Sequence, residues 1–379
     1  MLRSHRIAAF ILLLPWSSLL AAQATAPCLE RPPAERPYTR VRLLDTVKNQ
    51  TPVRAEYLIK TCGVRVPFNS ELESDLRESG AGDSIIAAVR DAAPKSTVVR
   101  KPDPTAEPVR PAKGDIKVHP KDGLRYVYIP PGAFRMGCSP GDPECRDSEK
   151  PAHPVRLTKG FWMGQTHVTV DAYKKYAHAN GRAMPDEPGY LDKNWNPDWI
   201  YESVPMTMVS FTDSQKYCEW VGMRLPTEAE WEYGARAGTT GPRYGELEEV
   251  AWWGGNSGDK PINADEVLKS DVQNYAKRLM DNGDRAHNVG QKQPNAFKLF
   301  DMLGGVWQWT SDWYKKGYDG EELETDPQGP PGGEFRVLRG GSWYSESNLV
   351  RASYRDRLVR PKNRDFLNGF RCVGETLVP

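Results

Sequence analysis

Histidine and cysteine are scarce in this chain of 379 residues, with six of each. No Cys-Xaa-Xaa-Cys pair occurs, and no cysteines and histidines stand close enough together to suggest a zinc site. An excess of charge is also missing, because the formal net charge is +1 and there is no acidic or basic tail. This balance gives no reason to expect nucleic acid or an anionic membrane surface as a partner.

Long hydrophobic stretches are limited to residues 7–20, near the N-terminus. Basic residues precede this stretch, and the small residues Ala22 and Ala24 follow it at the spacing that a signal peptidase reads. We therefore predict a signal peptide over residues 1–26 and a secreted or periplasmic protein. The stretch is too short for a membrane span, so no integral membrane segment is expected after cleavage. A retained N-terminal anchor is the alternative.

Aromatic residues and loop formers are plentiful, with 12 Trp, 16 Tyr, 33 Gly and 32 Pro. This composition predicts a folded protein with an aromatic core and many loops. At about 150 residues per domain, the length allows two or more domains.

The first expected domain is a small α-helical module over residues 27–95. Pro52 suits the first turn of a helix that Gly63 ends, Asn69 precedes a second helical stretch, and Asp83 is expected to cap a third. The sequence assigns no chemistry to this module, and a protein-docking or spacer role is the interpretation we prefer.

A linker is expected after the module, over residues 96–115. This segment mixes proline with charged residues and has no apolar period, which is typical of a stiff, solvated connection. The second expected domain covers residues 116–379 and begins with the strand-like alternation of residues 124–129.

Helix caps mark the middle of the second domain. Thr169 is expected to cap one helix, and Ser210 or Thr212 another. Thr227 and Glu230 form a capping box, which explains the acidic residues there without a catalytic role. Residues 259–284 look like an insertion with its own short helix around residues 264–280.

The C-terminal third of the domain combines aromatic residues, glycines and arginines at high density. Trp307, Trp309 and Trp313 lie within seven residues, and each can bury on the order of 150–250 Å². They are therefore expected to form a core, in irregular and tightly braced structure.

Four segments resemble the formylglycine-generating enzyme, or sulfatase-modifying factor, family. They are PNAFKLFDMLGGVWQWTSDWY (294–314), RVLRGGSWYSESNLVRASYRDR (336–357), RLPTEAEWEY (224–233) and GFRC (369–372). The resemblance runs in order over roughly two thirds of the chain. It implies an α+β domain with a C-type-lectin-like fold and much irregular structure.

The six cysteines are expected to pair, because export would place them in an oxidising compartment. Cys138 and Cys145 flank a turn-rich segment and can close a small loop. The resemblance implies a pair between Cys218 and Cys372, and elimination then leaves Cys28 for Cys62.

The resemblance also implies an activity, the oxidation of a sulfatase cysteine to an aldehyde by copper held between two thiolates. The two matching positions here are Ser345 and Val350. Copper(I) prefers sulfur ligands, and neither a hydroxyl nor an isopropyl group replaces a thiolate. We therefore expect no copper and no formylglycine generation. Ser342 and Trp307 match residues that line the family's oxygen pocket, although both can equally be packing residues.

A second enzymatic branch of the superfamily uses non-haem iron held by three histidines. The histidines here are His5, His119, His153, His167, His178 and His287, and no two of those beyond the signal peptide stand at helix-face spacing. An oxidative enzyme, copper-free or iron-dependent, stays the alternative function.

Calcium is the cofactor that the resemblance favours, in a structural role. The family binds it around the GGVWQW turn, and the matching positions are Asp301, Gly304, Val306 and Gln308. A turn stabilised by Trp307 and Trp309 without an ion is the alternative.

Binding rather than catalysis is the leading prediction for function. Mixed aromatic, polar and arginine surfaces suit adaptable recognition, and the lectin-like resemblance suggests a protein or glycan ligand. A cell-envelope scaffold, with the helical module as the active part, is a further alternative. The predicted ligand-binding groove contains Trp307, Trp309, Ser342, Trp343, Tyr344, Ser345, Tyr354 and Arg355.

Overall fold

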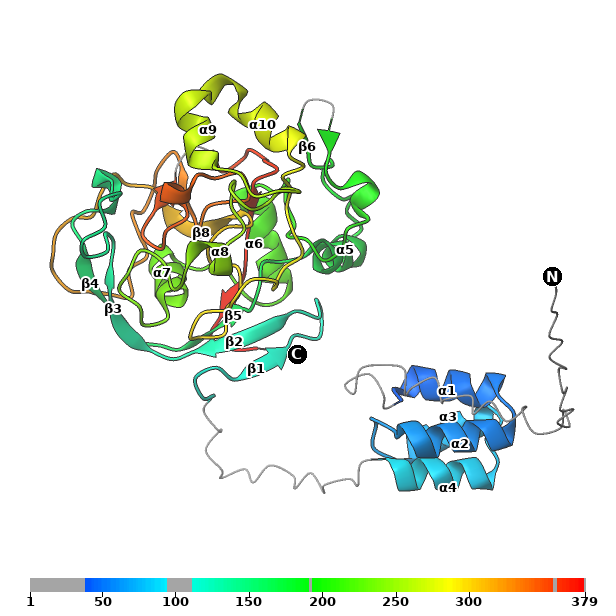
Figure 1. Cartoon of the computed structure of the whole chain (residues 1–379). Helices are drawn as coiled ribbons and strands as arrows, with labels where there is room; N and C mark the ends of the chain where they lie inside the picture. The colour runs from blue at the N-terminus through cyan, green and yellow to red at the C-terminus, as the bar shows by residue number, and fades with distance from the viewer. Residues whose placement is uncertain (1–37, 94–110, 191–192, 357–359, 378–379) are drawn as a thin grey trace, which may run out of the picture. The chain divides into compact units, whose positions relative to one another are not determined.

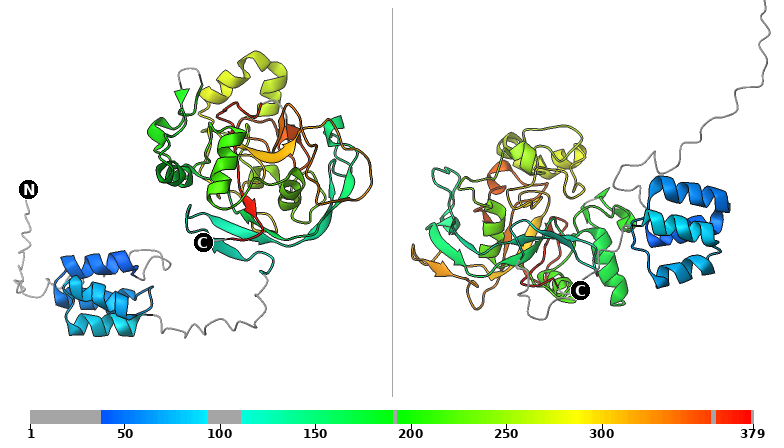
Figure 2. Two further views of the ribbon diagram at one scale, coloured as in Figure 1. Left: turned by 180° about the vertical axis from the view of Figure 1, so that it is seen from behind. Right: turned by 90° about the horizontal axis from the view of Figure 1, so that it is seen from below.

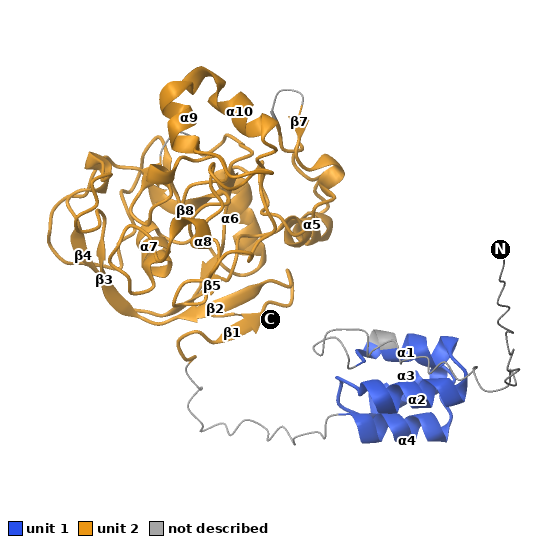
Figure 3. Ribbon diagram, viewed as in Figure 1, with its two compact units in different colours: residues 1–108 blue, residues 109–379 orange. Residues whose placement is uncertain are grey.

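The computed structural model describes residues 38–93, 111–190, 193–356 and 360–377. The chain divides into two compact units, residues 1–108 and 109–379 (Figures 1 and 3), with the boundary inside the segment predicted as a linker. The predicted signal peptide and Cys28 lie outside the described residues. Within the described residues, no helix is long and apolar enough to cross a membrane.

In residues 38–93, the described part of the first unit, four helices surround a core of their own. Pro52 begins the second helix, and the Asn69 side chain caps the third by accepting from the Leu72 backbone NH at 2.8 Å. Gly82, not Asp83, is the N-cap of the fourth helix; Asp83 lies in the first turn, where the helix dipole favours a carboxylate without a capping bond. The helices are α1 (Arg40–Asn49), α2 (Pro52–Cys62), α3 (Ser70–Glu78) and α4 (Asp83–Ala92).

The second unit is built on short strands in several small sheets. One four-stranded sheet has the order β1 (Ile116–Val118), β2 (Arg125–Ile129), β5 (Phe161–Gly164) and β13 (Val373–Gly374). A second has the order β11 (Arg355–Asp356), β10 (Arg336–Arg339), β8 (Trp307–Trp313) and β12 (Asn368–Gly369). The others combine β3 (Gly132–Met136), β4 (His153–Leu157) and β9 (Glu324–Thr325), and β6 (Gly189–Tyr190) with β7 (Lys193–Asn194).

Three helices of the second unit begin where the sequence predicts their caps. Thr169 accepts from Ala172, Ser210 accepts from Asp213, and Thr227 and Glu230 form the predicted capping box. The helices are α5 (Val170–Ala179), α6 (Phe211–Trp220), α7 (Glu228–Arg236), α8 (Leu247–Val250), α9 (Ala264–Ser270) and α10 (Tyr275–Asp281).

The insertion forms two helices, α9 and α10, rather than one. A single 3-10 turn, Val272–Asn274, separates them. Figure 1 and the left view of Figure 2 show both helices together on the outside of the unit. Lys193 of β7 donates to the Met280 backbone carbonyl, which ties the β6–β7 hairpin to α10.

The strand β8 crosses the interior of the second unit. Its residue Trp309 is fully buried, as are Trp231 of α7 and Trp343. Trp307 and Trp309 belong to one apolar cluster as predicted, whereas Trp313 is only half-buried and lies outside the described clusters, so the prediction of a core holds for two of the three tryptophans. Helices and small sheets in one unit confirm the predicted α+β class.

Candidate functional site

Five of the eight residues predicted to bind ligand line one cavity of about 410 Å³. Its walls come from the insertion helices, the start of β8 and the segment after β10, which are far apart in the sequence. The predicted residues that line it are Trp307, Ser342, Tyr344, Ser345 and Tyr354.

The other three predicted residues lie elsewhere, which corrects the idea of a single groove. Trp309 is enclosed, and its Nε1 donates to the Val209 carbonyl at 3.2 Å. Trp343 lines a separate cavity of about 650 Å³, where its ring lies against Trp195. Arg355 is buried in an ion pair described below.

Two serines lie at the inner side of the 410 Å³ cavity. The hydroxyls of Ser342 and Ser345 are 3.1 Å apart, and the Ser345 hydroxyl accepts from the Ser342 backbone NH at 3.0 Å. The chain turns tightly here because Gly340 and Gly341 have φ values of +99° and +81°. Val350, which the sequence resemblance matches to the second thiolate position, is fully buried in an apolar cluster.

Aromatic rings form most of the cavity wall. Tyr275 of α10 lies edge-on to Tyr344, with ring centres 5.2 Å apart, and its hydroxyl donates to the Tyr344 carbonyl at 2.9 Å. On the other side the rings of Trp307 and Tyr354 are 5.7 Å apart. Burial raises the pKa of Tyr354 to about 12, so this phenol stays neutral in the physiological range.

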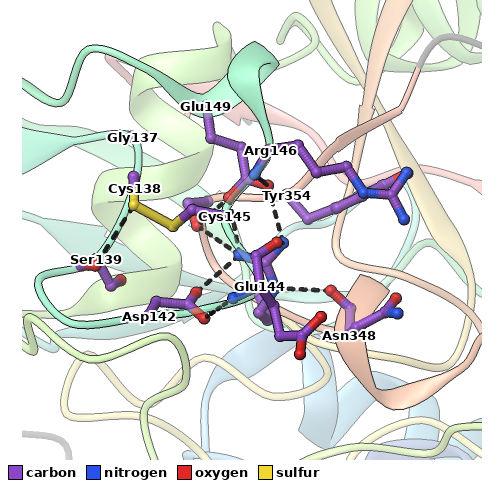
Figure 4. Close-up of polar contacts among 12 residues, drawn as sticks. Gly137, Cys138, Ser139, Asp142, Glu144, Cys145, Arg146, Glu149, Asn348 and Tyr354 are labelled. Carbon is purple, nitrogen blue, oxygen red and sulfur yellow. Dashed lines mark hydrogen bonds and ion pairs between the residues drawn. A yellow bond between two sulfur atoms is a disulfide. The ribbon is translucent and has the colours of Figure 1, made fainter.

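An arginine lies at Tyr354 without lining the cavity. Arg146 Nη1 donates to the Tyr354 hydroxyl at 3.1 Å, and its guanidinium is 4.8 Å from the ring centre. Figure 4 shows Arg146 beside Tyr354, next to the loop that the Cys138–Cys145 disulfide closes.

A second arginine anchors this loop. The buried Arg351 donates to both Glu149 carboxylate oxygens at 2.8 Å and to Asp142 at 2.8 Å. Ser353 also donates to Glu149, at 2.7 Å. These contacts hold the disulfide loop against the segment that carries Tyr354. The position of Arg146 therefore depends on the disulfide and on the contacts of Arg351.

Glu346 is an acidic residue on the wall of the cavity. Burial raises the pKa of its carboxyl, and the charge of Arg146 opposes that effect. Among the described residues, no hydrogen bond or ion pair reaches the Glu346 carboxylate. Asp356 also lines the cavity and is buried.

Arg355 pairs with Glu228 in the interior instead of facing a ligand. Its Nε and Nη2 donate to the two Glu228 oxygens at 2.6 and 2.8 Å. The Asp312 carboxylate is close, because it accepts from the Glu228 backbone NH at 2.7 Å. Burial raises the pKa of Asp312 to about 7, and the neighbouring Glu228 charge adds to the effect.

The four residues predicted to hold calcium are largely engaged with protein groups. Gln308 Oε1 accepts from Trp231 Nε1 at 2.9 Å and from Arg371 Nε at 2.7 Å. The Val306 carbonyl is 3.2 Å from His167 Nε2. Asp301 keeps one buried oxygen without a hydrogen-bond partner among the described residues, and burial raises its pKa to about 6.

A cation already occupies this neighbourhood. The buried Arg371 donates to the carbonyls of Phe300 and Asp301 at 2.9 and 3.0 Å, in addition to Gln308. A divalent cation would meet the guanidinium charge and a side-chain oxygen that already accepts two bonds. The residues present therefore do not fit the predicted calcium set.

Two histidines of the second unit lie next to backbone carbonyls. His153 Nδ1 is 3.3 Å from the Pro151 carbonyl, and His287 Nε2 is 2.8 Å from the Ser257 carbonyl. In the described parts of the chain, no three His, Cys, Asp or Glu side chains are placed to hold a metal ion.

The described cysteines are all in disulfides. The pairs Cys138–Cys145 and Cys218–Cys372 form as expected. Cys62 is also disulfide-bonded, and its predicted partner Cys28 lies outside the described residues.

Comparison with known proteins identifies the family of the second unit. Residues 112–376 match the model of the sulfatase-modifying factor enzyme 1-like domain. The chain belongs to this family. Formylglycine-generating enzyme of Streptomyces coelicolor is 30% identical over 332 residues, which cover 75% of this chain and 96% of that protein. Hercynine oxygenase of Mycolicibacterium smegmatis is 30% identical over 276 residues, covering 65% of this chain and 60% of that protein.

Solved structures confirm the fold of this sulfatase-modifying factor enzyme 1-like domain. PvdO from Pseudomonas aeruginosa superimposes with a TM-score of 0.57 at 24% identity, covering 70% of this chain and 99% of that one. Treponema denticola variable protein 1 gives 0.52 at 20% identity, covering 69% and 99%. At this identity the likeness extends to the fold alone, which is the C-type-lectin-like fold that the sequence predicts.

Sequence reasoning missed Tyr275, Arg146 and the role of Glu228. Tyr275 comes from the insertion, which contains none of the four segments that resemble the sulfatase-modifying factor family. Arg146 follows Cys145 directly, so the predicted disulfide loop was the one signal available for it. Glu228 lies 127 residues before its partner Arg355, and a pairing at this separation leaves no local pattern.

Proposed function

We propose that the sulfatase-modifying factor domain binds a ligand in the 410 Å³ cavity and does not generate formylglycine. The observation that carries this proposal is what lies at the two positions that the resemblance matches to the copper-binding thiolates, Ser345 and Val350. The Ser345 hydroxyl bonds to the Ser342 backbone, and the Val350 side chain is packed in the apolar core. Neither offers a thiolate, and the described cysteines are held in disulfides.

The composition of the cavity supports binding. Ligand sites are typically concave, lined mainly by apolar and aromatic groups, and supplied with a few polar groups that orient the ligand. Here Trp307 and three tyrosines provide the wall, and Ser342, Ser345 and Glu346 provide polar groups. The volume suits a small molecule, or one residue of a protein or glycan ligand.

An oxidative enzyme is the second candidate, and the similarity to hercynine oxygenase favours it. Iron chemistry would need ligands that the described histidines do not bring together. Stoichiometric iron in the purified protein, lost on replacing a histidine, would support this candidate over binding alone.

We also propose that the protein is exported to the periplasm or secreted. Residues 1–26 have the charge and small-residue pattern of a signal peptide. N-terminal sequencing of the exported protein should begin near Gln23–Cys28, and an intact Met1 in that fraction would contradict export with cleavage. The scaffold role of the helical unit is a separate proposal, which residues 27–95 alone would have to reproduce.

Saturation-transfer NMR with a mixture of small fragments tests the binding proposal. Leu349→Trp fills the cavity from its wall, and Leu323→Trp makes the same change at an exposed residue that lines no described cavity. We expect fragment signals that vanish in L349W and persist in L323W. A signal profile that is the same in both variants and the wild type would overturn the proposal.

A further inference from the structure

We propose that the 410 Å³ cavity selects a ligand with an organic cation, an alkylammonium or guanidinium group, that sits between the tyrosine rings and Glu346. The inference rests on the proposed function, because it names the class of ligand for the same cavity.

The charge of the cavity wall is one-sided. Glu346 and Asp356 are acidic, and none of the described residues that line the cavity is basic. Elsewhere in this unit, the buried carboxylates of Glu149 and Glu228 are matched by arginines within hydrogen-bond distance. The described wall of this cavity therefore has acidic residues and no basic residue.

Glu346 is the acidic residue of the wall on which the inference rests. Its carboxylate is half-buried and receives no hydrogen bond or ion pair from the described residues. Taking a carboxylate partly out of water is unfavourable unless a cation or donors compensate. A ligand cation in the cavity would supply that compensation, whereas an anionic ligand would increase the cost.

The aromatic rings suit the same ligand. Cations bind over the faces of Trp and Tyr within about 6 Å of the ring centre, and several rings together form a cage for ammonium groups. Trp307, Tyr275, Tyr344 and Tyr354 all line this cavity. Tyr354 already has the Arg146 guanidinium 4.8 Å from its ring centre, so this ring accepts a cation in the protein itself.

Arg146 does not form an ion pair with the Glu346 carboxylate of the cavity. Its side chain is exposed, it is absent from the described lining, and its hydrogen bond is to the Tyr354 hydroxyl. It lies close enough to Glu346 for their charges to interact, yet no ion pair joins them. We expect Arg146 to limit, but not prevent, entry of a second cation.

Paired probes that differ in charge test the inference by calorimetry. Butylguanidinium is compared with neutral N-butylurea, and the peptide acetyl-Gly-Arg-Gly-amide with its citrulline counterpart. The first pair represents a free small molecule and the second a protein segment, so the stronger pair identifies the source. We expect the cationic member to bind about ten-fold more tightly, the size expected for a cage with one carboxylate.

Two variants separate the inference from its foundation. Glu346→Gln should remove the preference for the cation, whereas Glu266→Gln, an exposed residue of α9, should leave it unchanged. If charged and neutral probes bind equally and L349W abolishes that binding, the preference for a cation is contradicted, but the proposal that the cavity binds a ligand is supported. If no probe binds, the preference for a cation is also contradicted, and the fragment experiment then tests whether the cavity binds any ligand. Binding that L349W does not change would overturn both.

Discussion

Arg371 Nε donates to the side-chain oxygen of Gln308 at 2.7 Å, inside the turn where the family resemblance implies calcium. The guanidinium is fully buried, and burial lowers its pKa to about 10, so it still carries its charge at neutral pH. Its other nitrogens donate to backbone carbonyls, including that of Asp301. The Arg371 guanidinium thus bonds to oxygens on both sides of the turn, those of Asp301 and Gln308.

This arrangement predicts a stability that does not depend on calcium. Adding calcium or a chelator should change the thermal unfolding midpoint by less than about 1 °C, because bound ligand stabilises the fold only where it binds the native state. Differential scanning fluorimetry measures the midpoint. Gln308→Glu introduces a carboxylate at the predicted site and is the matched variant, in which the unfolding midpoint should come to depend on calcium. A clear calcium-dependent rise in the wild type would show that Asp301 and the backbone carbonyls suffice to hold the ion.

The ion pair of Arg355 with Glu228 should carry much of the stability of its region. Replacing Arg355 with Ala leaves the buried Glu228 carboxylate with the more distant Arg339, whose Nε is 3.7 Å away, and we expect a loss of about 3 kcal/mol in the free energy of unfolding. Urea denaturation measures it. The control is Arg360→Ala, which removes an exposed pair with Glu334 and should cost at most about 1 kcal/mol. Equal losses in the two variants would contradict the structural role.

The buried Asp312 should make stability depend on pH. Its folded-state pKa is raised to about 7, so the folded protein holds a proton that the unfolded chain releases near pH 4. The contribution of this group to stability is therefore fully present below about pH 4 and is lost as the pH rises through about 7. From about pH 5 to pH 8 we expect the free energy of unfolding to decrease by on the order of 1–3 kcal/mol.

Other groups contribute to the same slope, because burial also raises the pKa of Asp284 to about 7. Asp312→Asn keeps an oxygen that accepts from the Glu228 backbone and removes the titration. Urea denaturation across this pH range should therefore give a shallower decline in the variant. An unchanged slope would show that Asp312 is ionised in the folded state.

The fold could be predicted from the sequence because the motifs that indicate it are local. The Thr227 capping box and the Thr169 and Ser210 caps each follow from neighbouring residues, and the structure has them where predicted. The site was only partly predictable. Ser342, Ser345 and Tyr354 share one segment and were grouped correctly, but Tyr275 comes from an insertion whose docking is set by tertiary contacts.

Arg355 shows why the rest of the site was missed. Sequence spacing places it with the neighbouring Tyr354, but adjacent residues of an extended segment point to opposite sides. Tyr354 lines the cavity, and Arg355 reaches Glu228 in the interior. Which side faces the cavity depends on partners more than a hundred residues away.

Mass spectrometry of a Cys-Xaa-Pro-Xaa-Arg sulfatase peptide tests the central claim most directly. The peptide is incubated with the purified protein, oxygen, reductant and either copper(I) or iron(II). Formylglycine-generating enzyme of Streptomyces coelicolor serves as the active control. We predict that the cysteine stays a thiol, because Ser345 and Val350 supply no thiolate. Conversion of the thiol to an aldehyde by this protein would contradict the account.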